Sequence, residues 1–435
     1  MRISRTTEES KFATRVLRDL QKEGGFSPQA AARLGLTFLA IVKGDDWSKI
    51  QHAVEENPLQ VADALNSVSY AAGLPFDLPM DPGTFSQLNP DVVRKVVSAF
   101  DKITPWQVES IQAVAEIFAM SAFKDPQTPP AVAGLVAEIA CPPAGATLFD
   151  PAVQAGMILL RTALRAENQP ASVYGWSSPD DSDDGDAWKV AWLVLRASGV
   201  EDVKICSAPP QDVNHRVPVP QADIVVTDLT RVSVSRVRDE RGPIPILQEL
   251  LTQGSPLVLL VPSNLLADSK IADLRKSLMH SNLTAVIRLP VSLFPRVVHD
   301  VDLLVVRGGE EPCLEREIFF LDVAAYLAAD TSRSLNAETS RMIGEMYRAF
   351  LEKKSRWAEG EIARFARAVN FWEVQEKQKK VPGSGLEVAL YVPPVVEPID
   401  LRTAFERLKK VKRERQEIEE ELEERIDNVL KTNRF

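Results

Sequence analysis

Histidine and cysteine are scarce in this sequence, and the few that occur are scattered. The 435 residues contain four histidines and three cysteines. No C-x-x-C pair occurs, and the histidines lack the spacing of metal ligands. We therefore expect neither a disulfide framework nor a metal site. The cysteine usage is typical of a reducing compartment.

Long apolar runs are missing as well. The most apolar stretch, SPLVLLVPSNLL, is too short to span a bilayer and is interrupted by Pro262. The N-terminal sequence MRISRTTEESKFATRVLRDL holds no apolar signal core. We expect a soluble, cytoplasmic protein that makes no membrane contact.

Basic residues are not in excess. The chain has 51 lysines and arginines against 61 aspartates and glutamates, a net charge of -10. A protein that binds DNA by itself usually has a basic surface patch, so the acidic net charge argues against unaided DNA binding. An acidic subunit can still act on DNA when a partner supplies the phosphate contacts.

Several signatures of other chemistries are also absent. The sequence contains no G-x-S-x-G and no Walker A loop, so hydrolase and nucleotide-triphosphatase functions lack support. The acidic run from Asp180 to Asp186 is similar to the start of a calcium loop. Counted from Asp180, however, position twelve is Ala191 instead of the required glutamate. We interpret the run as a solvated loop.

The first 120 residues or so are typical of helices. Ser27 followed by Pro28 predicts a helix start, because serine caps and proline is tolerated at the first helical position. Two further segments, NPDVVRKVVSAFDKI and WQVESIQAVAEIFAMSAF, carry apolar stripes at helical spacing, and we expect both stripes to be core. Their members are Val92, Val93, Val96, Val97 and Phe100, and then Val108, Ile111, Val114 and Phe118.

From about residue 128, short runs of valine, isoleucine and leucine alternate with helical stretches such as AWKVAWLVLRAS and KIADLRKSLMH. This alternation predicts an open, mainly parallel sheet with helices on both faces. Ligands in such sheets bind beyond the carboxyl ends of the strands. The expected strands are 146–150, 172–175, 203–206, 222–227, 256–262, 284–290, 301–307 and 317–323.

Helices are expected again near the C-terminus. Residues 340–380 favour a helix, and residues 400–430 favour a second one with many charges. The second carries a narrow apolar stripe, which is typical of a coiled coil or of a helix docked on a partner. The alternative is a solvated helix that caps its own domain. The stripe consists of Leu401, Phe405, Leu408, Val411, Ile418, Leu422 and Val429.

Several segments, in this order, carry a resemblance to one family. They are TPPAVAGLV (128–136), PPAGATLFDPAVQAGMILL (142–160), ASVYGWS (171–177), PQADIVVTDLT (220–230), residues 254–294, EIFFLDVA and LEVALYVPP (386–394). Together they resemble the modification subunit of type I restriction–modification systems, an adenine-N6 DNA methyltransferase family. The resemblance covers the whole chain and is clearest over residues 119–330.

The resemblance implies a three-part α/β protein. We expect an N-terminal helical domain (1–118), a Rossmann-like class I methyltransferase core (119–330) and a C-terminal helical region with a charged, coiled-coil-like tail (331–435). It also implies S-adenosylmethionine as cofactor, DNA bound within a complex, and a specificity-subunit-like or other protein partner held through the terminal helices.

The cofactor loop departs from the family pattern. The family has Asp-Pro-Ala-Cys-Gly-Ser-Gly-Gly, whose glycines let backbone approach the methionine end of the cofactor. This chain keeps Asp150 and Gly156 but has Val153 and Gln154 between them. The family's ribose-binding acid is replaced by Ser177. The residues left for the cofactor are Thr128, Asp150 and Gly156. We expect no cofactor to bind, with S-adenosylmethionine as the alternative.

The catalytic loop departs too. The family's fourth strand ends in Asn-Pro-Pro followed by an aromatic residue, which accepts hydrogens from the adenine amino group and stacks on the flipped base. Here the loop is Thr227, Asp228, Leu229 and Thr230, with no proline and no aromatic ring. Asp228 is an acceptor, but it stands one position late.

An arginine cluster follows the fourth strand in RVSVSRVRDER. The resemblance implies that this region faces DNA, so its members are candidates for phosphate contacts. A surface loop balanced by Asp239 and Glu240 is the alternative. The arginines are Arg231, Arg236, Arg238 and Arg241.

We therefore expect a modification-subunit-like pseudoenzyme that acts as a scaffold or DNA-engaging subunit of a restriction–modification or related defence complex. Two alternatives stay open. One is an active adenine-N6 DNA methyltransferase with an unusual loop, and the other is a sensor that binds S-adenosylmethionine without transferring its methyl group. Asp150 and Gly156 favour the alternatives, whereas Val153, Gln154 and Ser177 favour the pseudoenzyme.

Overall fold

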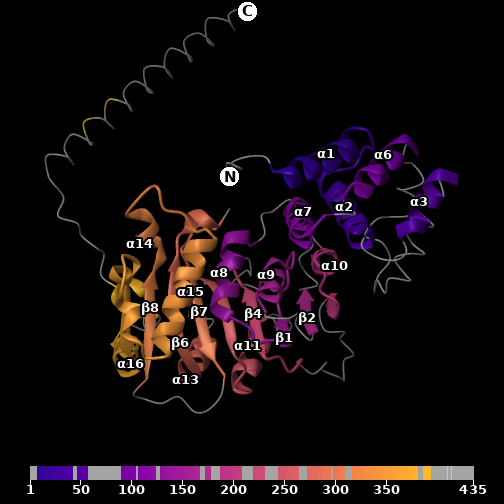
Figure 1. The fold of residues 1–435 in the computed structure, drawn as a ribbon. Coiled ribbons are helices and arrows are strands. Elements are labelled where there is room, and N and C mark those ends of the chain that lie inside the picture. Colours follow the sequence, from indigo (N-terminus) through magenta and orange to yellow (C-terminus); the bar gives the residue numbers. More distant parts are fainter. Residues whose placement is uncertain are drawn as a thin grey trace, which may run out of the picture. The chain divides into compact units, whose positions relative to one another are not determined.

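A computed structural model describes most of the chain, and everything below refers to those residues (Figure 1). They are 7–42, 47–56, 90–103, 106–123, 128–166, 172–177, 187–207, 219–230, 243–263, 272–294, 297–308, 316–380 and 386–392, with Lys409 and Arg413. The chain up to Val392 forms one compact unit, and Pro393–Phe435 forms a second. The helix expected over 400–430 thus lies outside the described residues except at Lys409 and Arg413. Among the described helices, none is long and apolar enough to cross a membrane.

The N-terminal part is helical, as expected. Its described helices are α1 (Glu8–Lys22), α2 (Pro28–Val42), α3 (Trp47–Glu56), α6 (Pro90–Asp101) and α7 (Val108–Ser121). Helix α2 begins where the sequence predicts, because the Ser27 hydroxyl oxygen accepts from the backbone N–H of Ala30 at 3.2 Å. The stripe on α6 is buried throughout. On α7, Ile111, Val114 and Phe118 are buried, but Val108 is 53% exposed because it is the first helical residue.

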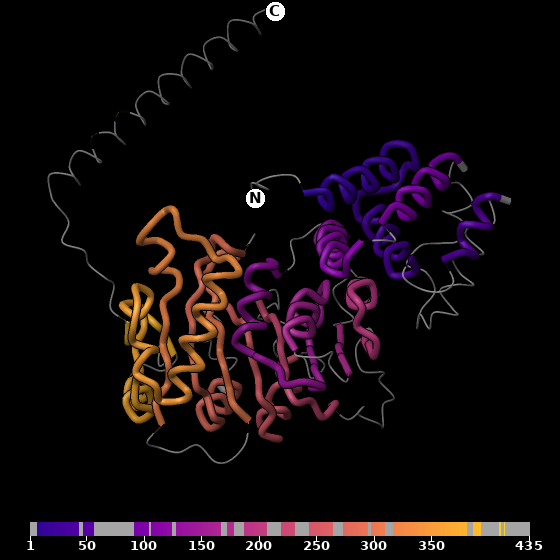
Figure 2. The backbone as a smooth tube through the Cα atoms, viewed as in Figure 1, coloured from indigo at the N-terminus to yellow at the C-terminus, as the bar shows by residue number. Residues whose placement is uncertain are grey.

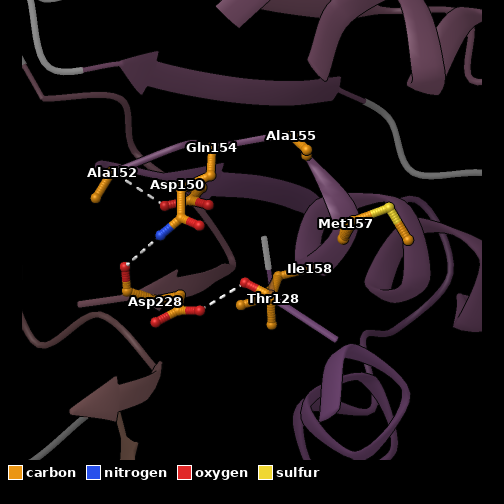
Figure 3. Close-up of a pocket in the computed structure, with 9 residues that line it drawn as sticks. Thr128, Asp150, Ala152, Gln154, Ala155, Met157, Ile158 and Asp228 are labelled. Carbon is orange, nitrogen blue, oxygen red and sulfur yellow. Dashed lines mark hydrogen bonds between the residues drawn. The ribbon is translucent and has the colours of Figure 1, made fainter. Parts of the chain in front are cut away.

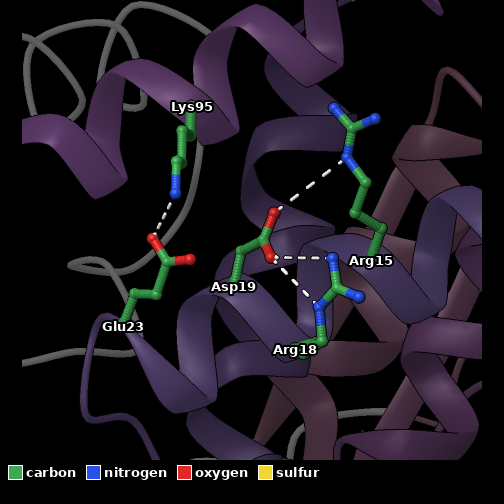
Figure 4. A network of polar contacts seen from close by, with 5 residues as sticks. All are labelled: Arg15, Arg18, Asp19, Glu23 and Lys95. Carbon is green, nitrogen blue, oxygen red and sulfur yellow. Dashed lines mark hydrogen bonds and ion pairs between the residues drawn. The ribbon is translucent and has the colours of Figure 1, made fainter.

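A polar network lies at the surface of α1 and α6, and one of its ion pairs joins the two helices (Figure 4). The Lys95 ammonium of α6 lies 2.6 Å from the Glu23 carboxylate at the end of α1, whereas Arg15 and Arg18 flank Asp19 within α1 at 4.0 and 3.3 Å. All three cations are at least half exposed, so solvent screens these ion pairs. Packing of the apolar faces therefore holds the two helices together, and the network adds little.

A nine-stranded sheet forms the centre of the rest of the unit. Its order is β3-β2-β1-β4-β5-β7-β6-β8-β9. The strands are β1 (Thr147–Asp150), β2 (Ser172–Ser177), β3 (Val203–Ser207), β4 (Ile224–Asp228), β5 (Leu257–Pro262), β6 (Asn282–Leu289), β7 (Val301–Arg307), β8 (Glu317–Asp322) and β9 (Ala366–Asn370). Strands β1 to β5 pair in parallel, whereas β7 and β9 run antiparallel to their neighbours. The expected mainly parallel sheet is confirmed.

Helices cover both faces of this sheet, which explains the apolar character of its strands. One face carries α8 (Pro130–Ala140), α9 (Met157–Arg165) and α15 (Ala337–Leu351), which lie in front of the strands in Figure 1, with α10 (Ala187–Ala197) beside α9. The other face packs on α11 (Pro243–Thr252), α13 (Ala272–His280) and α16 (Phe371–Lys380). Figure 2 follows the chain from the indigo helices through magenta β1–β4 to the orange strands.

The prediction of a helix over 340–380 is wrong in its middle. Helix α15 ends at Leu351, and α16 begins only at Phe371. Between them, Lys353 and Gly360 adopt positive φ, which a continuing helix does not allow. Two short 3-10 turns (Ser355–Ala358 and Ile362–Phe365) and strand β9 fill the gap. Sheet pairing with β8 overrides local helical periodicity here. The expected domain boundaries after residues 118 and 330 stay predictions.

Candidate functional site

The carboxyl ends of β1 and β4 lie side by side, and a small cavity opens beyond them (Figure 3). Its lining comprises Thr128, Asp150, Ala152, Gln154, Ala155, Gly156, Met157, Ile158 and Asp228. The structure thus brings together all three residues that the sequence offers for a cofactor, Thr128, Asp150 and Gly156. It adds one member of the expected catalytic loop, Asp228. The cavity volume is about 10 Å³, which accommodates roughly one water molecule.

Asp228 is held rigidly at the end of β4. Its side chain is 2% exposed. One carboxylate oxygen accepts from the Thr128 hydroxyl at 2.5 Å, and the other accepts from the backbone N–H of Thr230 at 2.7 Å. Each oxygen therefore accepts one hydrogen bond, and the Thr128 donor lies 100 residues from Asp228 in sequence. This satisfies the requirement that a buried carboxylate be hydrogen-bonded, and it fixes the turn that follows β4.

Asp150 has a less favourable environment. It is 4% exposed, and its Oδ1 accepts one hydrogen bond, from the backbone N–H of Ala152 at 2.9 Å. Burial raises the pKa of this carboxyl to about 7. Hydrogen bonds from the Ala152 N–H and the Thr227 hydroxyl oppose the rise, and the charge of Asp228 adds a smaller rise. Asp150 therefore holds a proton over much of the range below neutrality.

The loop between Asp150 and Gly156 fills the space instead of opening it. Val153 is 1% exposed and packs on Gly175 of β2, and its backbone N–H donates to the carbonyl of Trp176 at 2.8 Å. The Gln154 side chain reaches across the cavity, where its Nε2 donates to the Asp228 backbone carbonyl at 3.3 Å (Figure 3). In the described part of the chain, its Oε1 is buried without a hydrogen-bond partner.

Gly156 serves helix packing. It precedes α9 with a φ of 75°, in the left-handed region that favours glycine. A Cβ placed there would lie 2.9 Å from both Cα and Cβ of Ala191 on α10. The surviving glycine of the loop is thus explained by the close approach of α9 and α10, whether or not a cofactor binds.

The other strand ends supply no acid to the cavity within the described residues. Strand β2 ends in Ser177, which is 4% exposed, and β3 ends in Cys206 and Ser207. Burial raises the pKa of the Cys206 thiol, so this cysteine is an unreactive packing residue. The acidic run 180–186 lies outside the described residues, as do the four candidate DNA-contacting arginines, Arg231, Arg236, Arg238 and Arg241. No group of metal ligands occurs among the residues that the structure describes.

The expected catalytic loop points in several directions. Asp228 faces the cavity, whereas Thr227 is fully buried and does not line it. Leu229 is also buried, and its backbone N–H donates to the Leu260 carbonyl at 2.8 Å, which continues the ladder with β5. The loop therefore consists of the end of β4, one residue that continues its pairing with β5, and a turn at Thr230. Within the described residues, it presents no ring on which a base could stack.

S-adenosylmethionine does not fit the cavity at the ends of β1 and β4 as the described residues form it. Pockets for ligands of that size have volumes of about 300–1,000 Å³, and this cavity is far smaller. The Gln154 side chain occupies the space, and its hydrogen bond to the Asp228 carbonyl spans it. We derive no chemical step through the cofactor.

The fold and the position of the cavity together define a class of architecture. A doubly wound sheet with a cavity beyond the carboxyl ends of β1 and β4 is a Rossmann-like arrangement. The α/β fold class expected for the core is confirmed.

Comparisons with known proteins identify the relatives. Residues 244–389, less than half of the chain, match the family model described as N-6 DNA Methylase. This match begins on α11, after the residues of the cavity. A search of curated proteins found no match.

Solved structures extend the likeness to most of the chain. The methyltransferase subunit of a type I restriction–modification system from Streptococcus thermophilus is 14% identical, with a TM-score of 0.55, covering 88% of this chain and 99% of that one. A chain from a structure on complex assembly and conformational transition of the type I restriction–modification system is 15% identical, with a TM-score of 0.56, covering 99% and 100%. At this identity the likeness establishes the fold. The resemblance to type I modification subunits expected from the sequence is confirmed.

Sequence reasoning missed the partnership of Gln154 with the Asp228 carbonyl and that of Thr128 with the Asp228 carboxylate. Neither pair is close in the chain, and no motif spacing links them. The only available signal was the polar glutamine at a position where the family keeps a glycine.

Proposed function

We propose that this chain is a modification-subunit-type protein that has lost methyl transfer and works as a structural, DNA-engaging subunit of a restriction–modification or related defence complex. One observation carries the proposal. The Gln154 side chain is hydrogen-bonded across the cavity at the ends of β1 and β4, which leaves about 10 Å³. A methyl donor has no room between these residues as they stand.

The loop after β4 supports the same proposal. Methyl transfer to an adenine amino group needs an acceptor that positions the nitrogen. Asp228 is the acceptor nearest the cavity, and hydrogen bonds from the Thr128 hydroxyl and the Thr230 N–H fix the direction of its carboxylate. Beside it, the loop Thr227–Thr230 has neither the prolines nor the aromatic ring of the family's catalytic loop. We therefore expect it to position an adenine amino group poorly.

Calorimetric titration of S-adenosylmethionine into the folded chain tests the proposal. We expect no heat of binding at millimolar ligand, because the cavity would have to expel Gln154 first. The variant Gln154→Gly, which carries the family's residue, is the matched comparison, and any binding it gains would assign the block to this side chain. Micromolar binding to the unaltered chain would overturn the proposal and favour the sensor or the active enzyme.

The proposed role in a complex needs an assembly element. We propose the tail from residue 400 for it, because its apolar residues recur at spacings of three and four within a highly charged sequence. The partner would be specificity-subunit-like or another coiled-coil-forming protein. The solved structure on complex assembly of the type I system, which covers 99% of this chain, supports a role of this kind.

Deleting residues 400–435 should abolish assembly with the partner and leave the compact unit up to Val392 folded. Light scattering of the mixed proteins measures the complex mass, and circular dichroism of the truncated chain checks its fold. Leu408→Asp with Leu422→Asp should act like the deletion, whereas Lys410→Ala, which helical spacing places opposite Leu401 and Leu408, should not. A complex of unchanged size after the deletion would remove the tail from the interface.

A further inference from the structure

The cavity between β1 and β4 holds two buried carboxyl groups and one buried amide oxygen. Asp150 and Asp228 are 4% and 2% exposed, and both line the cavity. They come from adjacent parallel strands. Two ionised carboxylates at one small, buried cavity repel each other, and the charge of Asp228 adds to the rise in the pKa of Asp150 that burial causes.

Hydrogen bonds and burial together show which carboxyl carries a proton. Asp228 accepts from two donors, Thr128 and Thr230. Asp150 accepts from the Ala152 N–H at Oδ1, and the Thr227 hydroxyl, which has a smaller effect on its pKa, is its other donor. A proton is better placed on Asp150, because burial raises the pKa of this group to about 7.

Gln154 is the group that can use such a proton. Its Nε2 donates to the Asp228 carbonyl, but its Oε1 is buried and lacks a donor among the described residues. A buried acceptor without a donor costs free energy comparable to a lost hydrogen bond. Protonated Asp150, which lines the same cavity, has a hydroxyl that can supply the missing donor (Figure 3).

We propose that a proton on Asp150, donated to the amide oxygen of Gln154, locks this cavity closed, and that loss of the proton releases Gln154 and opens the cavity. When the proton leaves, Asp150 becomes a second buried anion beside Asp228, and Gln154 again lacks a donor. Both changes favour an open state in which water reaches the carboxylates. The lock depends on the cavity geometry and does not require the chain to bind S-adenosylmethionine.

The titratable neighbours of Asp150 are few. Of the described residues that line the cavity, Asp228 from β4 is the only other titratable group, and the segment before α8 and the start of α9 contribute Thr128, Met157 and Ile158. A single protonation on Asp150 should therefore control opening.

Hydrogen–deuterium exchange of the peptide that spans residues 150–156, read between pH 5 and pH 9 and corrected for intrinsic exchange, tests the lock. Because opening releases one proton, the opening constant should rise about tenfold per pH unit and level off near pH 7. The variant Asp150→Asn, which keeps the acceptor for the Ala152 N–H, should remove this slope.

Two further variants separate the lock from a general effect of burial. Gln154→Met keeps the side-chain length but removes the amide oxygen, so the opening constant should level off at a lower pH than in the unaltered chain. Asp302→Asn removes another buried aspartate, on β7, whose burial raises its pKa to about 6, and should leave the slope at residues 150–156 unchanged.

An equal slope in the unaltered chain and in Asp150→Asn, or a flat profile in the unaltered chain, would overturn the proposal. If Asp150→Asn fails to fold, Gln154→Met tests the proposal by itself. If the opening constant of Gln154→Met levels off at the same pH as that of the unaltered chain, the contact between Asp150 and Gln154 is excluded. No cofactor enters the measurement, so binding of S-adenosylmethionine by calorimetry would refute the proposed function and leave this result standing.

Discussion

The purified chain, alone or with its partner and DNA, is expected to incorporate no labelled methyl group above background. Two separate features of the described structure lead to this result. The Gln154 side chain of the cofactor loop spans the cavity. In the loop that corresponds to the family's catalytic loop, Thr227 and Asp228 belong to β4, Leu229 bonds to β5 and Thr230 is in a turn. The first feature removes the binding site of the methyl donor. The second removes the groups that would position the adenine amino group as acceptor.

The variant Gln154→Gly separates these two causes. It should enlarge the cavity, because the side chain that spans it is gone. Methyl incorporation should nevertheless stay at background even at saturating S-adenosylmethionine, because Asp228 remains bound to Thr128 and Thr230, and no aromatic ring has been added. The measurement is transfer of a radiolabelled methyl group to DNA of mixed sequence, with an active adenine methyltransferase as the positive control. Incorporation by the unaltered chain would establish an active enzyme, and incorporation by the variant alone would trace the loss to one side chain.

Gly156→Ala is expected to destabilise the unit by about 2–4 kcal/mol. An alanine at a φ of 75° costs about 1–2 kcal/mol, and its Cβ would meet Ala191 at 2.9 Å, so that α9 and α10 must separate. Urea denaturation followed by circular dichroism measures the free energy of unfolding.

The matched control is Gly134→Ala in the interior of α8. A Cβ at Gly134 meets nothing within 4 Å, and a helical alanine is favoured over glycine by about 0.5–1 kcal/mol. The two substitutions are chemically identical and should change stability in opposite directions. A loss below about 0.5 kcal/mol at Gly156 would mean that the contact with Ala191 relaxes freely and that the glycine is kept for another reason.

Local patterns in the sequence were sufficient for most elements of the fold. Strands such as β4 and β5 are continuous runs of buried residues, which fixed their positions to within a few residues before any tertiary contact was known. Ser27 and the stripe on α6 likewise predicted their helices, because capping and helical periodicity act over one to three turns.

Non-local pairing decided the rest. Strand β9 is a short, half-exposed segment that becomes a strand only because β8 pairs with it, so the helical periodicity around it was misleading. The insertion of β7 between β5 and β6 is equally invisible in the sequence, since order in a sheet depends on contacts between distant segments.

The candidate site divides in the same way. The sequence by itself determined which groups stand at the strand ends, namely Asp150 and Asp228 as the acids, and which residues of the family pattern are missing. Only the tertiary structure decided that Thr128 and Asp228 meet over 100 residues of sequence, that Gln154 spans the cavity, and that Gly156 serves the packing of α9 on α10. The physical reason is that burial and hydrogen-bond partnership, which set the protonation and reach of each group, are properties of the assembled sheet.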